Sequence, residues 1–425
     1  MKSGPMLWLL LPALSLVVTK PTWAAEAAVA SEEAELEALR KAAEEMAGPV
    51  EAAPAEAEVA PETAPGPRFL PALNPEVSVI GDVVFSLNDT EAESQQQEGE
   101  EEHAHPEPPL FLFGRDKFTL RTLELSLQAP LDPFSLAKVF LHWGGEGHVH
   151  VCEAYIDYTN LGKGWRLKCG KFRPTLGVLN RWHEHALPQV DPPRVYSWLF
   201  SEGSLSGLGL EVSRLVGPFW ADTNELALGV INGSDPFTLA GEDFDRPALT
   251  LHLKSYYDLN PSIYFEWGLS GLVGWNDPAG DNLTHLEVLD FTYDWTPVGR
   301  AKYRGLTVRG ELFWCHRQQE HFIYEHLHPA GATPERYATS LSGYLYAEQT
   351  FQRNWQRGLR LDYVELPDRP QDREWGLSAY VTFWQSEFTR WRLQYSHLER
   401  NFAPNENVLF LQVDWGMGPH RHEAY

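Results

Sequence analysis

The sequence contains few cysteines, with three in 425 residues. Cys152, Cys169 and Cys315 are an odd number with wide spacing, which excludes a zinc knuckle and a disulfide framework. Cys152 and Cys169 fall on neighbouring predicted strands, at positions that do not bring them opposite one another. We therefore expect three free thiols.

Basic residues are also scarce. Lys and Arg number 34 against 59 Asp and Glu, and the formal net charge is −25. Residues 26–110 carry most of this excess, with 21 acidic and 3 basic side chains. Binding to nucleic acid requires clustered Lys and Arg, so the composition excludes a nucleic-acid partner.

Long apolar runs are absent beyond the first residues. Residues 6–18 are apolar, follow Lys2 and precede a small-residue site at Ala24, so residues 1–24 are predicted to be a cleaved signal peptide. No later stretch approaches the roughly 18 apolar residues that a spanning helix needs. No nucleotide-binding loop, catalytic triad or well-placed carboxylate pair occurs, so we expect that the protein is not an enzyme.

Residues 25–71 are rich in Ala, Glu and Pro and are predicted to be a low-complexity periplasmic segment. Within it, residues 31–47 carry helix signals, because Ser31 can cap and Leu36 and Leu39 begin a coiled-coil-like spacing. This short helix is either solvated or part of a periplasmic oligomerisation segment. Residues 48–71 are predicted to be a linker, and residues 72–425 one β-barrel domain.

The most informative stretch is residues 302–317, KYRGLTVRGELFWCHR. Leu306, Leu312 and Trp314 share one parity, and Arg309 and Glu311 share the other. Successive side chains of a β-strand point to opposite faces, so this strand has an apolar face and a charged face. A transmembrane β-barrel needs this pattern, with apolar residues toward lipid and polar residues toward a wet lumen.

Sixteen stretches are predicted to be strands, most of them with this two-residue alternation. They are residues 75–88, 115–129, 134–144, 149–159, 165–172, 206–216, 222–233, 246–258, 261–275, 284–297, 302–317, 337–353, 355–366, 373–385, 387–400 and 405–418. Short and long connections alternate between them, as in a barrel with tight periplasmic turns and long extracellular loops.

These patterns predict an all-β fold, a 16-stranded antiparallel transmembrane β-barrel with both termini in the periplasm. A ring of this size leaves an aqueous channel. The Trp and Tyr content is typical of aromatic girdles at the two membrane interfaces. The predicted location is the outer membrane of a Gram-negative-type bacterium, with membrane lipid as a partner.

Two blocks of sequence carry a resemblance to a bacterial family. They are NPEVSVIGD at residues 74–82 and CGKFRPTLGVLNRWHEHALPQVD at residues 169–191. In these blocks the chain resembles the porin-like outer-membrane proteins named zinc-regulated TonB-dependent outer membrane receptors, which are distantly similar to phosphate-selective porins. The resemblance covers residues 71–425 and implies an outer-membrane channel with a link to zinc.

The long loop after the fifth predicted strand, residues 173–205, is predicted to fold into the lumen, by analogy with a loop of general porins. Pores select by charge at a constriction. The predicted constriction residues are Lys168, Lys171, Arg173, Arg181, Glu184, Asp191 and Arg194. Their mixed signs predict a transverse field rather than anion selectivity.

Other charged residues fall on the predicted lumen face of the strands. The lumen-facing candidates are Lys138, His142, Arg309, Glu311, Arg360 and Asp362. They either line the path of the solute or form a structural network of charges between strands.

Histidines occur in pairs spaced two residues apart. On a strand, such a pair presents both rings on one face, about 7 Å apart, where they can share a metal ion. The metal candidates are His183, His185, His148, His150, His103 and His105. The alternative is that these are hydrophilic loop residues without a third ligand. No cofactor is expected, although zinc could be a transported or loop-bound ion.

The sequence thus predicts a passive, homotrimeric porin-like channel for small hydrophilic solutes, with divalent zinc among the candidate solutes. The alternative is a TonB-linked receptor for a metal or metallophore, which the family resemblance and the histidine pairs support. The third hypothesis is a barrel enzyme or a closed structural barrel with an occluded lumen.

Overall fold

A computed structural model describes residues 75–89, 116–144, 149–159, 161–201, 203–241, 244–319 and 337–419. These residues belong to one compact unit, Phe69–Tyr425. The signal peptide, helix and linker predicted within residues 1–71 lie outside the described residues, as do His103, His105 and His148. Those predictions stay predictions.

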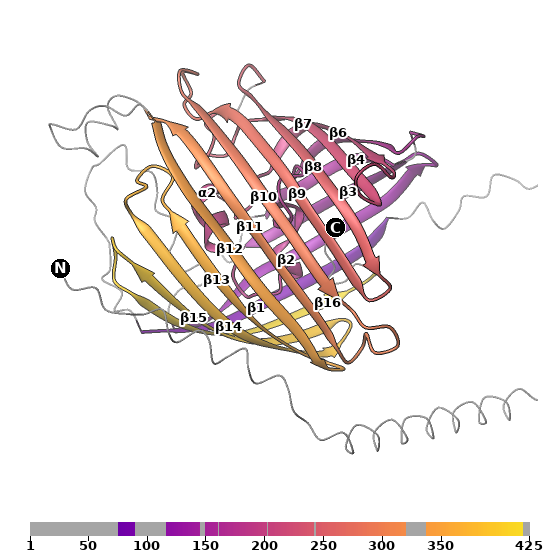
Figure 1. The fold of residues 1–425 in the computed structure, drawn as a ribbon, viewed down its shortest axis with the longest axis vertical. Helices are drawn as coiled ribbons and strands as arrows, with labels where there is room; N and C mark the ends of the chain where they lie inside the picture. The colour runs from indigo at the N-terminus through magenta and orange to yellow at the C-terminus, as the bar shows by residue number, and fades with distance from the viewer. Residues whose placement is uncertain are drawn as a thin grey trace, which may run out of the picture. The chain divides into compact units, whose positions relative to one another are not determined.

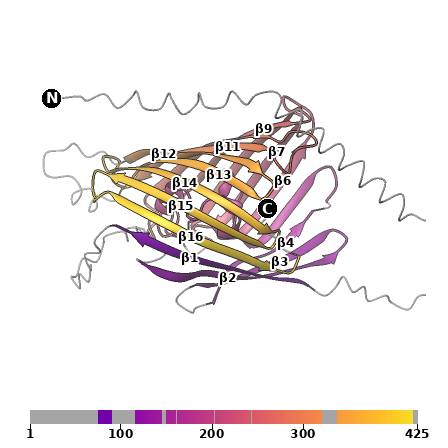
Figure 2. The ribbon, with the colours of Figure 1, turned by 90° about the horizontal axis from the view of Figure 1, so that it is seen from below.

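Sixteen strands close into one antiparallel barrel, in which each strand pairs with its neighbours in sequence and β1 pairs with β16 (Figures 1 and 2). The strands are β1 (Glu76–Asn88), β2 (Lys117–Asp132), β3 (Ser135–Gly144), β4 (Val149–Tyr158), β5 (Trp165–Phe172), β6 (Gly207–Val216), β7 (Thr223–Asn232), β8 (Pro247–Asn260), β9 (Ile263–Trp275), β10 (Leu283–Trp295), β11 (Gly305–Gln318), β12 (Tyr337–Gln352), β13 (Trp355–Glu365), β14 (Arg373–Ser386), β15 (Thr389–Arg400) and β16 (Glu406–Met417). The predicted fold class is confirmed.

The strand boundaries agree with the predicted ones to within three residues. The largest differences, of three residues, are at the end of β2, which reaches Asp132 rather than residue 129, and at β11, which begins at Gly305 rather than at residue 302. Residues 300–304 instead belong to a turn, in which the N–H groups of Tyr303 and Arg304 donate to the carbonyl oxygen of Arg300. Gly299, with φ of +76°, supplies the left-handed conformation that this turn uses.

The two faces of the wall differ as the alternation predicted. On β13, Leu359 and Leu361 are 56% and 52% exposed, whereas Arg360 between them is 1% exposed. Exposed leucines in such number on every side of a barrel are compatible with lipid rather than with water. Aromatic side chains gather near both ends of the strands, with Trp355 next to a short turn and Trp375 toward the opposite end.

Short connections follow the even-numbered strands, and the longer ones mostly follow the odd-numbered strands. The links after β3, β9, β13 and β15 are short exceptions, and the link between β10 and β11, residues 296–304, is longer than these four. Val79 near the start of β1 lies opposite Met417 at the end of β16. Both ends of the barrel sequence therefore lie at the end of the short turns.

The connection after β5 contains three short helices that sequence patterns did not predict. They are η2 (Leu179–Arg181), η3 (Glu184–Ala186) and α2 (Arg194–Leu199). Pro193 occupies the N-cap of α2, where its missing N–H costs nothing. Every residue of α2 is buried, and the helix lies against β12 and β13 on the inner side of the wall (Figure 1).

No helix within the described ranges is long and apolar enough to cross a bilayer. All three cysteines are free thiols, as expected, with Cys152 and Cys315 buried and Cys169 exposed.

Candidate functional site: a lumen narrowed by an inner loop

The connection between β5 and β6, residues 173–205 and here called the inner loop, is folded into the barrel. Its apolar side chains are buried together with inward-facing residues of the wall. Tyr196 packs edge-on against Phe313 of β11, with ring centroids 5.3 Å apart. The wall contributes Leu272, Leu286, Val288, Phe313, Tyr344 and Tyr346 to this cluster. The inner face of β9–β12, here called the apolar wall, is therefore built to receive the inner loop.

One carboxylate organises the polar contacts at the apolar wall. Glu311 accepts hydrogen bonds from the Tyr196 hydroxyl at 2.8 Å, from the Tyr344 hydroxyl at 2.9 Å and from the backbone N–H of Val178. Gly177 has φ of +58°, and a Cβ at this position would overlap the Glu311 carboxylate. Both the conformation and the close approach thus require glycine at residue 177.

The opposite side of the inner loop meets strands β13–β16 with β1 and β2, here called the charged wall. Arg360 donates to the Asp191 carboxylate at 2.8 Å and to the Asp362 carboxylate at 2.7 Å. Arg194 donates to Glu374 at 2.6 Å. Burial raises the pKa of Asp191, but the Arg360 charge and the hydrogen bonds outweigh it, so this pKa is below its usual value.

Arginines of the charged wall also hold the backbone of the inner loop. Arg390 donates to the carbonyl oxygen of His185 at 2.6 Å, and Arg392 donates to that of Leu187 at 3.0 Å. Arg121 of β2 donates to the carbonyl oxygen of Val190. Hydrogen bonds from charged donors are stronger than neutral ones, so these contacts fix the position of the loop backbone.

Opposite charges lie side by side on the same wall. Arg390 pairs with Asp414 and Arg121 with Asp82, while Lys254 lies 2.9 Å from Glu266 on the other side of the lumen. The sequence predicted a transverse field from the mixed charges of the inner loop. Asp191 and Arg194 are each paired with a wall residue of opposite charge, so their fields partly cancel. The transverse field itself stays a prediction.

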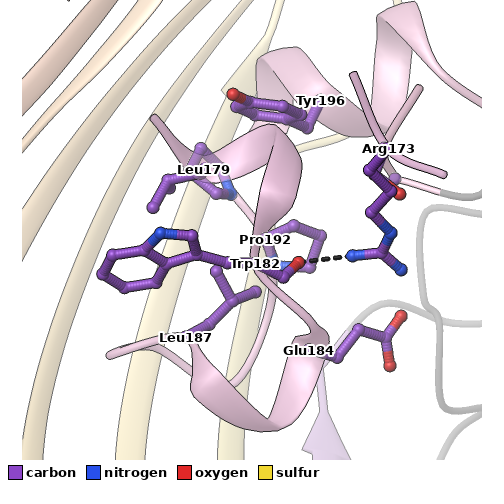
Figure 3. A pocket seen from close by; sticks show the side chains of 10 residues that line it. Arg173, Leu179, Trp182, Glu184, Leu187, Pro192 and Tyr196 are labelled. Carbon is purple, nitrogen blue, oxygen red and sulfur yellow. Dashed lines mark hydrogen bonds between the residues drawn. The ribbon is translucent and has the colours of Figure 1, made fainter. Parts of the chain in front are cut away.

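A pocket opens in the inner loop itself (Figure 3). Trp182, Leu187 and Tyr196 line it together with Arg173 and Glu184. The Arg173 guanidinium donates to the carbonyl oxygen of Trp182. The cavity volume is about 20 Å³, which is room for a water molecule and not for a larger solute.

The structure brings six of the seven predicted constriction residues to the lumen. Lys168 points inward and lies 3.7 Å from Glu211, and Arg181 ends η2 in a half-buried position. Arg173, Glu184, Asp191 and Arg194 make the contacts described above. Lys171 is the correction, because it lies three residues after Lys168 and so points outward, where its ammonium donates to the carbonyl oxygen of Val151.

All six lumen-facing candidates point inward. Lys138 lies between Gln128 and Tyr155 in the strand ladder, on the same face as His142. Arg309 stacks over the Trp182 ring of the inner loop, 4.6 Å from its centroid. Glu311 and Arg360 hold the inner loop through the contacts described above, and Asp362 accepts a hydrogen bond from the backbone N–H of Arg194 at 3.0 Å. Their role is thus more than a network between strands, because three of them anchor a separate segment.

The predicted pair His183 and His185 lies in a turn rather than on a strand, with ring centroids 5.7 Å apart. His183 Nδ1 lies 2.7 Å from Glu124 Oε2, and His183 Nε2 lies 3.0 Å from Glu153 Oε1. Burial lowers the pKa of His183, but the Glu124 charge and both hydrogen bonds outweigh it and raise the pKa to about 10.

His150 faces His142 across the β3–β4 ladder, with ring centroids 5.5 Å apart.

Several site residues were missed. The residues that were not among the predicted site residues are Arg121, Glu124, Glu374, Arg390 and Arg392. The signal available was their parity, since each falls on the polar face of its strand. Parity identifies the lumen face but does not reveal which lumen residues contact the inner loop.

Comparison with known proteins supports the fold. The chain is similar to the solved structure of OprB from Pseudomonas putida, with a TM-score of 0.51 and 10% identity over 81% of this chain and 94% of that one. OmpT, an outer membrane protein of Vibrio cholerae, gives a TM-score of 0.50 and 7% identity over 82% of this chain and 99% of that one. At such low identity the likeness shows a shared barrel fold.

In sequence, the chain is 28% identical over 342 residues to an uncharacterised protein of Aquifex aeolicus (strain VF5), which covers 72% of this chain and 70% of that protein. No protein-family model matches the chain. These findings do not show the zinc-regulated receptor family that the two sequence blocks resemble.

Proposed function

We propose that the protein is a passive outer-membrane channel for small hydrophilic solutes, assembled as a homotrimer. The observation that carries this proposal is the inner loop, which is held across the lumen of a closed barrel by contacts with two walls. A barrel that only needed to be filled could use apolar side chains throughout. Here polar side chains line the lumen around the loop, which is the property of a water-filled path.

Local pairing of charges supports low charge selectivity. Most arginines of the charged wall lie beside a carboxylate, so their fields cancel over short distances. Solutes are then sorted mainly by the space that the inner loop leaves.

The test uses the full chain in liposomes with sugars of increasing size. We expect swelling rates that fall steeply with sugar size, and a reversal potential near zero in a potassium chloride gradient. Absence of swelling with the smallest sugar would reject the channel, and a strong preference for one ion sign would reject the charge-pairing argument. Cross-linking of the purified protein measures the oligomer, and a monomer alone would reject the trimer.

Passage of divalent metal ions, zinc among them, is a second candidate function. The cluster of Glu124, His142 and His183 beside the inner loop favours it, since carboxylate and imidazole are ligands of such ions. A zinc-sensitive dye inside the liposomes measures this flux, and no entry of zinc through conducting channels would reject it.

The energised receptor is the alternative that the sequence resemblance implies. A passive channel keeps its uptake rate in cells that lack the inner-membrane energy transducer. A loss of uptake in that strain would favour the receptor.

A further inference from the structure

The side chains around Glu124 form an unusual convergence of nitrogen atoms. His142 Nε2 and His183 Nδ1 each lie 2.7 Å from Glu124 Oε2, and His185 Nδ1 lies 3.5 Å from the same oxygen. All four residues are buried. Ligand atoms of Glu124, His183 and His185 lie within 4.8 Å of one another, and so do those of His142, Cys152 and His183.

We propose that Glu124, His142, His183 and His185 form a binding site for a divalent transition-metal ion of the zinc class, which ties the inner loop to β2 and β3. A tetrahedral zinc ion with bonds of about 2.0–2.1 Å places its ligand atoms roughly 3.4 Å apart. The distances of the three imidazole nitrogens from Glu124 Oε2, 2.7–3.5 Å, lie near that value, and binding by all four residues requires His142 and His185 to approach each other. Three imidazoles and one carboxylate match the borderline softness of zinc rather than calcium or magnesium.

Glu153 adds a feature typical of such sites. A histidine that binds a metal through one ring nitrogen usually donates from the other nitrogen to a carboxylate or carbonyl, which orients the ring. His183 has this arrangement, with Nδ1 toward Glu124 and Nε2 3.0 Å from Glu153 Oε1. A bound ion replaces the proton between His183 and Glu124, and Glu153 keeps the ring in place.

A β-bulge brings a soft atom to the edge of the site. The register between β3 and β4 shifts at Phe140 and Leu141, so that Cys152 as well as Glu153 faces the interior. The Arg173 guanidinium donates to the Cys152 sulfur at 3.3 Å. This contact assigns Cys152 to the surroundings of the site rather than to its four ligands, and the Arg173 charge is offset by Glu153, 3.9 Å away.

The location gives the site a consequence for the inner loop. His183 and His185 belong to the loop, whereas Glu124 and His142 belong to the wall. An ion held by all four links the two, in addition to the contacts of the apolar and charged walls. Binding of an ion by these four residues does not require that this ion is the solute that crosses the membrane.

The test is a titration of the full-length, chelator-washed protein in detergent with Co²⁺, followed by competition with Zn²⁺. We expect the visible absorption band of four-coordinate cobalt at one equivalent and its displacement by zinc. His183→Gln and His185→Gln are expected to lose this band. His252→Gln is the matched control, because His252 is also a buried lumen histidine but bonds to Ser270.

Glu153→Gln keeps the test valid if the ligand variants do not fold, which heat-modifiable gel migration reports. It is expected to weaken zinc binding about 10–100-fold. A purely structural role for Glu153 would lower stability and leave zinc affinity unchanged, which would overturn the proposal. So would no cobalt band in the wild-type protein, or a band that persists in both ligand variants. Conductance without metal is measured separately, so a silent channel that binds zinc would reject only the proposed function.

Discussion

The two walls that hold the inner loop differ in the physics of their contacts. The apolar wall buries aromatic and aliphatic side chains around one carboxylate, Glu311. The charged wall contributes arginines that donate to carbonyl oxygens and to Asp191. Burial of apolar surface is favourable but not directional, whereas hydrogen bonds from a guanidinium depend on geometry.

The difference indicates a division of roles between the two walls. The apolar wall supplies attraction between the inner loop and the barrel, and the charged wall selects the position that the loop adopts. Changes in the apolar wall should therefore loosen the loop, while changes in the charged wall should also alter its position. The following predictions are in order of decreasing expected effect.

Arg360→Ala should have the largest effect. It removes the ion-pair partner of both Asp191 and Asp362, and breaking buried ion pairs by removing one partner costs roughly 3–5 kcal/mol. Denaturant unfolding measures the loss of stability. The open-channel current reports the position of the inner loop, and it should increase because the loop is released. Arg357→Ala is the control, because Arg357 lies on the same strand but is exposed and bonds to Gln349. Equal behaviour of the two variants would contradict the role of the charged wall.

Phe313→Ala tests the apolar wall. Phe313 is 1% exposed and packs on Tyr196, so its truncation should cost about 3 kcal/mol. The current should become noisier, because the loop is loosened without losing its arginine contacts. Trp314→Ala is the matched control, since Trp314 faces outward and is 53% exposed. A larger loss of stability in Trp314→Ala than in Phe313→Ala would mean that packing on the outer face of the barrel stabilises the protein more than packing in the lumen does.

Gly177→Ala should lower stability for two reasons, the left-handed backbone conformation and the overlap of the new Cβ with Glu311. A left-handed conformation costs a residue with a Cβ roughly 1–2 kcal/mol. Gly203, with φ of +67°, carries the same cost, but the nearest atom to its Cβ would be Pro192 Cγ at 3.7 Å. Gly177→Ala should therefore destabilise more than Gly203→Ala in denaturant unfolding, because only its Cβ meets Glu311. Equal losses would mean that the loop and Glu311 move apart freely.

The pH dependence of the charged wall should give the smallest effect. The pKa of Asp191 is lower in the folded protein than in the unfolded chain, so its contribution is complete above the ordinary value of about 4. It is lost as the pH falls through the lowered folded value. The contribution of Asp191 should therefore be constant between pH 7 and pH 5, and at lower pH its loss should release the loop and raise the current.

Asp191→Asn removes this titration while it keeps the size of the side chain. The difference between wild type and variant below pH 4 is therefore the relevant quantity, since other carboxylates titrate in both. An identical pH profile in the two proteins would contradict the role of Asp191.

Much of the fold could be predicted from sequence because one side of the wall faces lipid. Lipid penalises an outward charge, so most of the sixteen strands show the two-residue alternation, as at Leu359, Arg360 and Leu361. The same parity, applied carefully, would have placed Lys171 on the outer face. It could not have placed Cys152, because the β-bulge that turns it inward leaves no clear pattern in the sequence.

The site was predicted only as a set of residues. Phe313 and Val288 are apolar residues at inward-facing positions, and in the structure they are buried together with residues of the inner loop. The carbonyl contacts of Arg390 and Arg392 join residues about 200 positions apart, and no local pattern encodes such a distance. The short helices of the loop escaped prediction because each is stabilised by contacts with the wall rather than by its own sequence.

Single-channel recording of the wild-type protein beside Arg360→Ala tests most directly whether a loop held by two walls narrows a water-filled pore. The account predicts discrete current steps in the wild type and larger steps in the variant. A wild-type protein that inserts into the bilayer and conducts no current, or a variant with steps of the same size, would contradict it.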